Sequence, residues 1–190
     1  SRLCMSSSVA GHQRAFGSDT VPGNYQDLEL ATLIVLIGSN TAWCHPVIYQ
    51  RIRAAKEKNP DLKIVVIDPR QTATSEIADL HLPVKPGSDA LLFNGLLAYL
   101  HDRGDSNTHF VDAFTEGMQP ALEAAHACAP STAAVATGCG LREQDVKRFY
   151  LWFSVNEKTV TVYSQCINQT SSGTDKVNAI INCHLATGRI

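Results

Sequence analysis

Residues 32–46 read T-L-I-V-L-I-G-S-N-T-A-W-C-H-P, and the fold follows from this stretch. A run of branched apolar residues, Leu33 to Ile37, stops at a short polar turn. An uninterrupted apolar run of this length is typical of a parallel strand that is buried on both faces. In open parallel sheets, ligands bind beyond the carboxyl ends of the strands. The turn from Gly38 to Thr41 therefore suggests a site for a nucleotide-like group, but an ordinary strand-to-helix turn that binds nothing explains the same letters.

Further apolar runs extend this strand into a sheet. A helical segment that starts at Pro46 leads to a second strand over residues 63–67, K-I-V-V-I, and these elements make a right-handed βαβ unit. The pattern continues with a brief strand over residues 81–84 and another over 159–163. The helix is expected to turn one apolar face inward: Val47, Ile48, Ile52 and Ala55. The predicted fold class is α/β, a Rossmann-like open, mainly parallel sheet with helices on both faces and a mainly helical insertion.

Composition excludes several classes of protein. The chain has 190 residues and a net charge of −2, so no basic surface indicates nucleic acid or an anionic membrane as a partner. No apolar run approaches the ~20 residues that a membrane span requires. The six cysteines include no C-x-x-C pair, which argues against a zinc ribbon or an iron–sulfur cluster formed within this segment. Scattered cysteines fit a reducing compartment, and the predicted location is cytoplasmic.

Polar segments follow the four predicted strands, and a parallel sheet would bring them to one edge. An acid after the second strand, Asp68, suits a ribose hydroxyl or a base amine, and Arg70 can pair with a phosphate. Asp89 can accept two hydrogen bonds from a guanine edge, but both aspartates could instead cap helices and Arg70 could form a surface ion pair. The candidate residues are Gly38, Ser39, Asn40 and Thr41; Asp68, Pro69, Arg70 and Gln71; Gly87, Ser88 and Asp89; and Gln165 to Gln169. The G-x-G-x-x-G fingerprint is absent from the first turn, which disfavours an ordinary NAD dehydrogenase.

Cys4 is a candidate nucleophile or metal ligand. It lies in a Ser-rich segment with Arg2, His12 and Arg14 nearby in the sequence, and cations of this kind favour a thiolate. A lone cysteine is also commonly a structural residue. The sequence pattern alone leaves both interpretations open.

Four motifs in order resemble the molybdopterin oxidoreductases of the dimethyl sulfoxide reductase family: R-L-C-M-S-S-S-V-A-G, G-S-N-T-A-W-C-H-P, V-I-D-P-R-Q-T-A-T and P-G-S-D-A. The likeness covers essentially the whole chain and is greatest to the catalytic subunits of assimilatory nitrate reductases. It implies molybdenum held by two molybdopterin guanine dinucleotides, with Cys4 as the catalytic residue and the protein ligand to the metal. Formate dehydrogenases usually have His after this cysteine, whereas this chain has Met5, so the resemblance favours nitrate as the substrate.

The resemblance also assigns the cofactor contacts. They fall on residues 38–41, 68–71 and 87–89, with a second cofactor near Gln165 and Gln169. The family commonly has Met-Gly where this chain has Gln165-Cys166, so Gln169 is the better-supported member of that turn. Arg2 or Arg14 could attract nitrate.

The family's amino-terminal cysteine motif and large carboxyl-terminal part have no counterpart here, so the resemblance implies an internal piece of a subunit. Residues 1–24 would be an active-site loop segment belonging to a neighbouring part of the subunit. Residues 25–190 would form the Rossmann-like domain that binds molybdopterin guanine dinucleotide, with a helical insertion at about 104–157. A 4Fe-4S cluster is expected in the full-length protein but outside this segment, and the piece alone is expected to be inactive.

Three functions remain open at this point. The first is reduction of nitrate to nitrite for nitrate assimilation by oxygen-atom transfer, with an electron donor protein or reductase subunit as partner. The second is a formate dehydrogenase of the same family. The third is a nucleotide-binding module without redox chemistry, which would bind guanine nucleotides tightly and would not need Cys4.

Overall fold

A parallel four-stranded sheet forms the centre of the computed structural model, which describes residues 3–190. Its strands are β1 (Leu33–Ile37), β2 (Lys63–Ile67), β3 (Leu80–Leu82) and β4 (Thr159–Tyr163), in the order β3-β2-β1-β4. All neighbouring pairs are parallel, and Ile37 aligns with Ile67 on one side and with Tyr163 on the other. The predicted parallel sheet is confirmed. Ser1 and Arg2 lie outside the described residues. The expectations that Arg2 favours the Cys4 thiolate or attracts nitrate therefore fall outside the described residues too.

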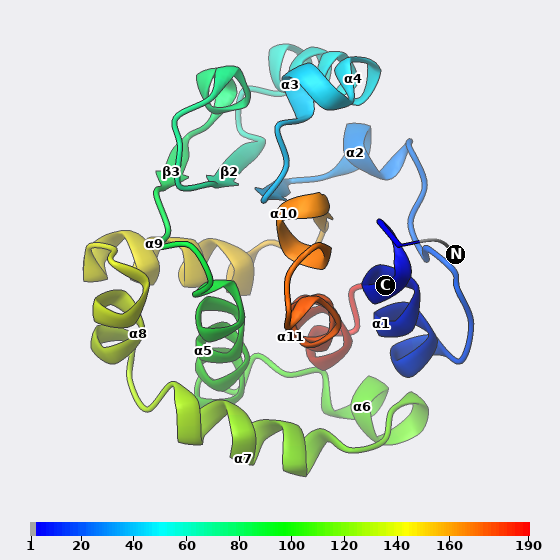
Figure 1. Ribbon diagram of the computed structural model, residues 1–190, viewed down its shortest axis with the longest axis vertical. Helices are drawn as coiled ribbons and strands as arrows, with labels where there is room; N and C mark the ends of the chain where they lie inside the picture. The colour runs from blue at the N-terminus through cyan, green and yellow to red at the C-terminus, as the bar shows by residue number, and fades with distance from the viewer. Residues whose placement is uncertain (1–2) are drawn as a thin grey trace.

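Helices cover both faces of the sheet (Figure 1). Ile34 and Leu36 of β1 face a core that includes residues of α2 (Asp27–Leu30) and α4 (Pro46–Lys58). Leu33, Val35 and Ile37 face the larger core, which is built from α5 (Asp89–Asp102), α9 (Glu143–Val155) and α11 (Gly173–Thr187) among others. Because successive side chains of a strand point to opposite faces, burial on both sides requires the continuous apolar run of β1.

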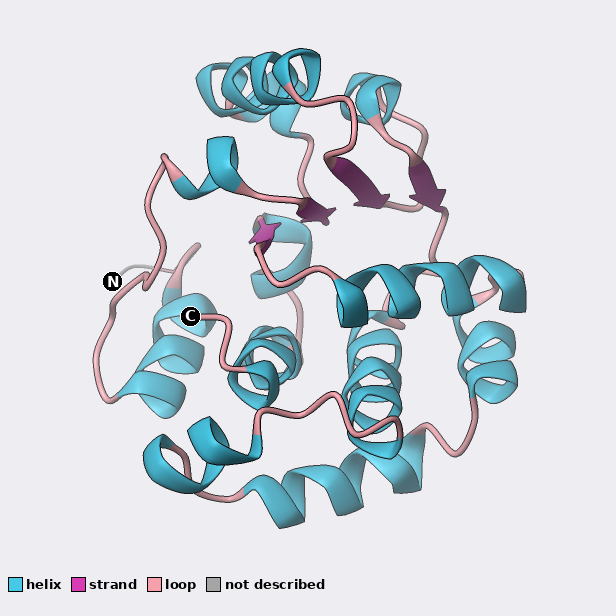
Figure 2. Cartoon of the chain, turned by 180° about the vertical axis from the view of Figure 1, so that it is seen from behind, coloured by secondary structure: helices cyan, strands magenta, loops and turns pink. Residues whose placement is uncertain are grey.

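The larger layer contains the helical insertion. It is formed by α6 (Thr108–Phe114), α7 (Met118–Cys128), α8 (Thr132–Cys139) and α9, between α5 and β4. Figure 2 shows these helices on the side of the strands opposite α4. The remaining elements are α1 (Ser6–Phe16), α3 (Thr41–Cys44), the 3₁₀ helix η1 (Ala73–Ile77) and α10 (Gln165–Asn168). The sequence pattern missed α8 and the one-turn helices α3 and α10, because short helices carry little periodicity.

The prediction for the inner face of α4 is wrong at one residue, Val47. Ile52 and Ala55 are buried as expected, but Val47 is 67% exposed. Val47 and Ile52 are five positions apart, which in an α-helix puts them about 140° apart around the axis. Val47 therefore lies outside the apolar stripe.

The order of the strands contains a reversal. The chain passes from β1 to β2 to β3 in one direction and then crosses back to add β4 on the other side of β1. Ligands of doubly wound sheets bind at such a reversal, beyond the carboxyl ends of the strands. The carboxyl edge near Gly38 and Tyr163 is therefore the place where this fold favours a ligand. Within residues 3–190, every helix is too short or too polar to cross a bilayer.

Gly38 is required by the packing of α10 on the end of β1. Its φ is +57°, and a Cβ at this position would lie 2.9 Å from Cβ of Cys166 and 3.2 Å from Cγ1 of Ile167. We expect Gly38→Ala to lower the free energy of unfolding by about 2 to 5 kcal/mol, because left-handed backbone strain adds to overpacking. Urea denaturation measures the loss.

Gly104→Ala is the matched control for this change. Gly104 has a φ of +77°, but a Cβ at this position would have no neighbour within 4 Å, so only backbone strain of about 1 to 2 kcal/mol is expected. Equal losses in the two variants would contradict the close packing of α10 on β1.

Candidate functional site

The first two polar turns meet at the carboxyl edge of the sheet. The backbone N–H of Gly38 donates to the carbonyl of Ile67 at 3.0 Å, which places the turn after β1 beside the end of β2. Thr74, which follows β2, donates its hydroxyl to Oδ1 of Asn40 at 3.2 Å and accepts the backbone N–H of Ala42 at 3.0 Å. Hydrogen bonds therefore join the turns 38–41 and 68–74 at this edge, as the parallel topology predicts.

The two hydroxyls of the first turn point inward. Ser39 and Thr41 are both buried, and their hydroxyl oxygens are 2.8 Å apart in a hydrogen bond. Asn40, between them, is only partly buried. A ligand at this turn would therefore meet Asn40 and backbone groups rather than the Ser39 and Thr41 hydroxyls.

Asp68 is a buried acid that forms no ion pair within residues 3–190. It is 4% exposed, and its Oδ1 accepts the backbone N–H of Arg70 at 2.8 Å. This contact is a local turn within the chain and not a helix cap, since the following helix η1 is preceded by Thr72. A buried carboxylate is costly unless hydrogen-bond donors surround it. The remaining oxygen of Asp68 is suited to a donor supplied by a ligand.

Other residues of this turn are available to solvent. Pro69, Arg70 and Gln71 are exposed, and Arg70 makes no ion pair within the described part of the chain. The exposed guanidinium of Arg70 can contact a phosphate, and the carboxylate of Asp68, two residues earlier, can accept from donors of a ligand.

The third turn leads into the opposite layer. Gly87 has a φ of +89°, and the Ser88 hydroxyl donates to the carbonyl of Lys85 at 2.6 Å. Asp89 begins α5, and its Oδ2 accepts from Nζ of Lys176 on α11 at 2.7 Å. The side chains of Lys176 and Asp89 are 4% and 13% exposed. Asp89 thus has a buried cation as its partner, which the sequence reasoning missed because Lys176 lies in an otherwise apolar helix face.

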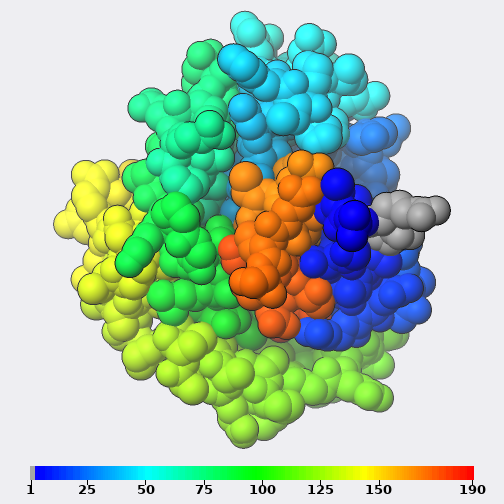
Figure 3. All heavy atoms as spheres, in the orientation of Figure 1, coloured from blue at the N-terminus to red at the C-terminus, as the bar shows by residue number. Residues whose placement is uncertain are grey.

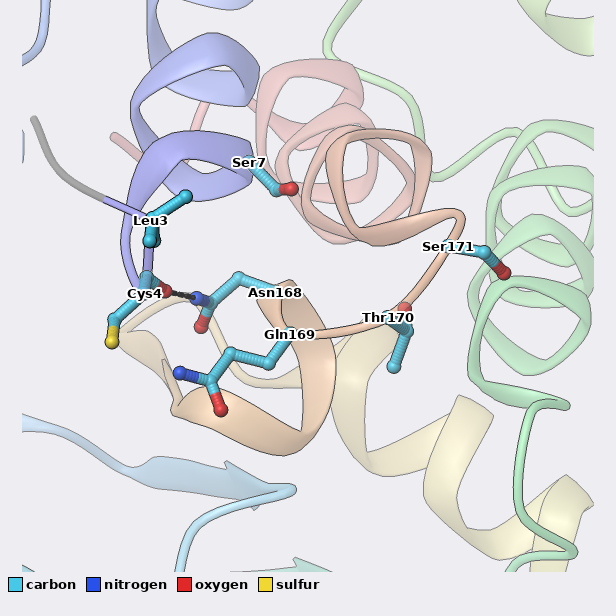
Figure 4. A pocket seen from close by; sticks show the side chains of 7 residues that line it. All are labelled: Leu3, Cys4, Ser7, Asn168, Gln169, Thr170 and Ser171. Atoms are coloured by element: carbon cyan, nitrogen blue, oxygen red, sulfur yellow. Dashed lines mark hydrogen bonds between the residues drawn. The ribbon is translucent and has the colours of Figure 1, made fainter.

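Cys4 and Gln169 line the same depression in the surface. This open depression, of about 440 Å³, is hereafter the Cys4 depression (Figure 4). Its lining residues are Leu3, Cys4, Ser7, Asn168, Gln169, Thr170 and Ser171. Figure 4 shows the Cys4 sulfur and the Gln169 amide pointing to the same side. The two predicted residues from opposite ends of the chain are therefore neighbours.

The surface around this depression is assembled from distant segments. In Figure 3 the orange atoms of the α10 region border the dark blue atoms of the first described residues on one side and the cyan atoms that follow β1 above. Gln165 is exposed on α10, and the next residue, Cys166, packs against Gly38. The turns after β1 and β4 thus share this face with Cys4.

The cations expected near Cys4 are directed elsewhere. Because α1 is helical, Arg14 lies about 12 Å along the axis from Ser6. Its Nη1 contacts Oδ1 of Asp175 at 3.0 Å, and it lines a separate cavity of about 690 Å³. His12 is buried, with one ring nitrogen 3.0 Å from the Tyr163 hydroxyl and the other 2.5 Å from the Thr20 carbonyl. The expectation that His12 and Arg14 activate Cys4 is wrong, since the helix carries both away from it.

The contact of His12 with Tyr163 is a feature that the sequence analysis missed. In a neutral imidazole, Nδ1–H of His12 donates to the Thr20 carbonyl and Nε2 accepts from the Tyr163 hydroxyl. The Ser8 hydroxyl lies 2.5 Å from the same oxygen, and burial raises the pKa of Tyr163, so the phenol keeps its proton. This chain of hydrogen bonds attaches α1 to the carboxyl end of β4.

Within residues 3–190 no three His, Cys, Asp or Glu side chains are grouped so that they could hold a metal ion. A thiolate is a soft ligand of the type that binds redox-active metals.

Comparison with known proteins places the chain in a family. The family model described as molybdopterin oxidoreductase matches residues 1–190. A nitrate reductase of Shewanella frigidimarina is 50% identical over the whole chain, which covers 20% of that protein. The periplasmic nitrate reductase of Desulfovibrio desulfuricans is 34% identical, and the F420-dependent formate dehydrogenase subunit alpha of Methanocaldococcus jannaschii is 32% identical. The whole chain is matched in both cases and covers 26% and 28% of those proteins.

The fold has a solved counterpart. The acetylene hydratase of Pelobacter acetylenicus superposes with a TM-score of 0.83 over 98% of this chain and 25% of the hydratase, at 20% identity. This likeness supports the fold. The chain spans between 20% and 28% of the length of the relatives named here.

Proposed function

Because this chain belongs to the molybdopterin oxidoreductase family, we propose that it is part of the catalytic subunit of a molybdenum-dependent nitrate reductase. The proposed reaction is the reduction of nitrate to nitrite by oxygen-atom transfer. The observation that carries the proposal is the Cys4 depression, in which an exposed thiol lies beside Gln169 next to the polar carboxyl edge of a parallel sheet. The relative with 50% identity carries the name nitrate reductase.

The residues at this edge fit a dinucleotide form of molybdopterin. Asp68 has a free carboxylate oxygen for a ribose hydroxyl or a base amine, and Arg70 is exposed and can pair with a phosphate. Oδ1 of Asn40 accepts from the Thr74 hydroxyl, which leaves its Nδ2 group as a donor for a ligand. These side chains, with Gly38 and the turn 87–89, would hold one of two molybdopterin guanine dinucleotides.

The second dinucleotide would lie at the other side of the reversal. Gln165 and Gln169 belong to the turn after β4, and Gln169 also lines the Cys4 depression. When bound, the molybdenum cofactor would supply the two-electron reduction that turns nitrate into nitrite. The role of this chain would be to provide the Cys4 thiolate, to exclude solvent from one side of that thiolate, and to orient the two dinucleotides.

Several finer features belong to the same proposal. Residues 1–24 would complete the active site of a larger subunit and residues 25–190 would form its dinucleotide-binding domain. A 4Fe-4S cluster and an electron donor protein would serve the full-length protein from outside this segment, and the segment alone would be inactive. We propose a cytoplasmic location, because all six cysteines are free and scattered cysteines fit a reducing compartment. The proposed role in nitrate assimilation rests on the resemblance of the motifs to assimilatory nitrate reductases.

The formate dehydrogenase relative supports one alternative, a formate dehydrogenase of the same family. Formate oxidation would use the same cofactor and the same Cys4. Met5 after Cys4 favours nitrate, as the resemblance of this motif implies.

The test uses the whole protein that contains this chain, purified without oxygen. We expect nitrite to form with reduced viologen as donor, molybdenum to be present, and acid hydrolysis to release two molecules of GMP per molybdenum. Formate oxidation without nitrate reduction would establish the alternative. A metal-free protein that binds guanine nucleotides tightly would instead establish the module without redox chemistry.

A further inference from the structure

Asn168 connects α10 to the segment that carries Cys4. Its side chain is buried, with the residue 3% exposed, and Nδ2 donates to the carbonyl oxygen of Cys4 at 2.6 Å (Figure 4). Cys4 itself is exposed and precedes the first turn of α1. Within residues 3–190 no other side chain donates to this carbonyl.

This hydrogen bond is the first of a row between α1 and the α10–α11 region. The Thr174 hydroxyl donates to the carbonyl of Ser7 at 3.4 Å, and Nδ2 of Asn178 donates to the carbonyl of Gly11 at 2.8 Å. The helices are in close contact, since a Cβ on Gly11 would lie 2.6 Å from Cγ1 of Val177. The rest of α1 is therefore held by packing as well as by hydrogen bonds.

The position of Cys4 depends on fewer contacts. It lies beyond the packed part of α1, in a segment whose neighbours Leu3 and Met5 are exposed. Asn168 is followed directly by Gln169, which lines the Cys4 depression. One buried amide thus couples the backbone of Cys4 to the turn that carries Gln169.

We propose that Asn168 is a positioning residue, whose side-chain amide holds the Cys4 carbonyl so that the thiol stays beside Gln169. A buried donor is well suited to this role, because a hydrogen bond shielded from water is not exchanged for one to solvent. The importance of the held thiol rests on the proposed function, in which Cys4 is the ligand of molybdenum. Asn168 acts through Cys4 and touches neither substrate nor metal.

Asn168→Asp in the whole protein tests this role. The change keeps the size of the side chain but replaces the donor NH₂ by an oxygen, which then faces the Cys4 carbonyl. In metal-free protein we expect the backbone amide of Val9, which donates to the carbonyl of Met5 at 2.9 Å and closes the first turn of α1, to exchange with deuterium about tenfold faster. This is the effect of losing one hydrogen bond that anchors the turn. In metal-loaded protein we expect a changed Mo(V) electron paramagnetic resonance spectrum, because the ligand is no longer held in one orientation.

Asn178→Asp is the matched control, since it makes the same replacement opposite the carbonyl of Gly11. It should leave both the exchange of the Val9 amide and the Mo(V) spectrum as in the wild type. Unchanged exchange in Asn168→Asp, or an equal increase in both variants, would overturn the proposal. If Asn168→Asp does not fold, Asn168→Leu removes the amide without adding charge and is measured in the same way.

The two readouts separate this inference from the proposed function. Faster exchange needs no cofactor, so it reports on Asn168 alone. A wild-type protein that never shows molybdenum would contradict the nitrate reductase proposal, while the exchange result would still decide whether Asn168 holds Cys4.

Discussion

Cys4→Ala in the whole protein is expected to lower the rate of nitrate reduction by more than about 100-fold, because loss of a metal ligand exceeds the effect of changing its supporting contacts. The thiol is exposed in the Cys4 depression and makes no hydrogen bond with other residues between 3 and 190. Its removal should therefore leave the free energy of unfolding within about 0.5 kcal/mol of the wild type. Viologen-linked nitrite formation and molybdenum content measure the effect.

Cys128→Ala is the control for this change. Cys128 is also an exposed thiol, but it lies on α7 within the helical layer and contacts the carbonyl of Ala125. We expect this variant to retain the wild-type rate. A Cys4→Ala protein with normal nitrate reduction would refute Cys4 as the ligand, and equal losses in both variants would point to general damage from thiol removal.

Lys176→Ala is expected to cost about 3 to 5 kcal/mol in the free energy of unfolding, because it leaves Asp89 as an unpaired charge in a buried place. The two side chains are only 4% and 13% exposed, and their 2.7 Å contact joins α11 to the first residue of α5. Chemical denaturation at neutral pH measures the loss. A loss below about 1 kcal/mol would show that the pair behaves like a surface ion pair.

Two further variants complete the comparison. Arg53→Ala removes one partner of the exposed pair between Arg53 and Glu57 and should cost no more than about 0.5 kcal/mol. The double change Lys176→Met with Asp89→Leu replaces both charges by apolar groups and should recover most of the stability, as is common for buried pairs. A double variant no more stable than Lys176→Ala would contradict the charge-burial argument.

The double variant also separates two roles of Asp89. If the acid serves only as the partner of Lys176, the variant should carry a normal amount of guanine dinucleotide. If it also contacts a guanine edge, as the resemblance implies, the GMP released per protein should fall although the fold is restored. The stability and the cofactor content are independent measurements.

The strands and most helices could be predicted because their causes are local. A five-residue apolar run such as β1 is typical of a strand buried on both faces of a parallel sheet, and the polar turns at Gly38 and Asp68 mark where strands end. Parallel strands then place those turns at one edge whatever the loops between them contain. The family followed from motif letters, and the comparison confirmed it.

The partners of individual side chains were decided by packing between segments far apart in the chain. Nothing local to Asp89 indicates Lys176, nothing around His12 indicates Tyr163, and Asn168 contacts Cys4 only because α1 packs on α11. The helix α1 likewise carries Arg14 away from Cys4, although the two are close in sequence. Local patterns specify periodicity and burial, whereas hydrogen-bond and charge partners depend on which surfaces meet. The sequence was therefore sufficient for the sheet and its edge, and the tertiary structure alone determined which contacts hold Cys4, Asp68 and Asp89 in place.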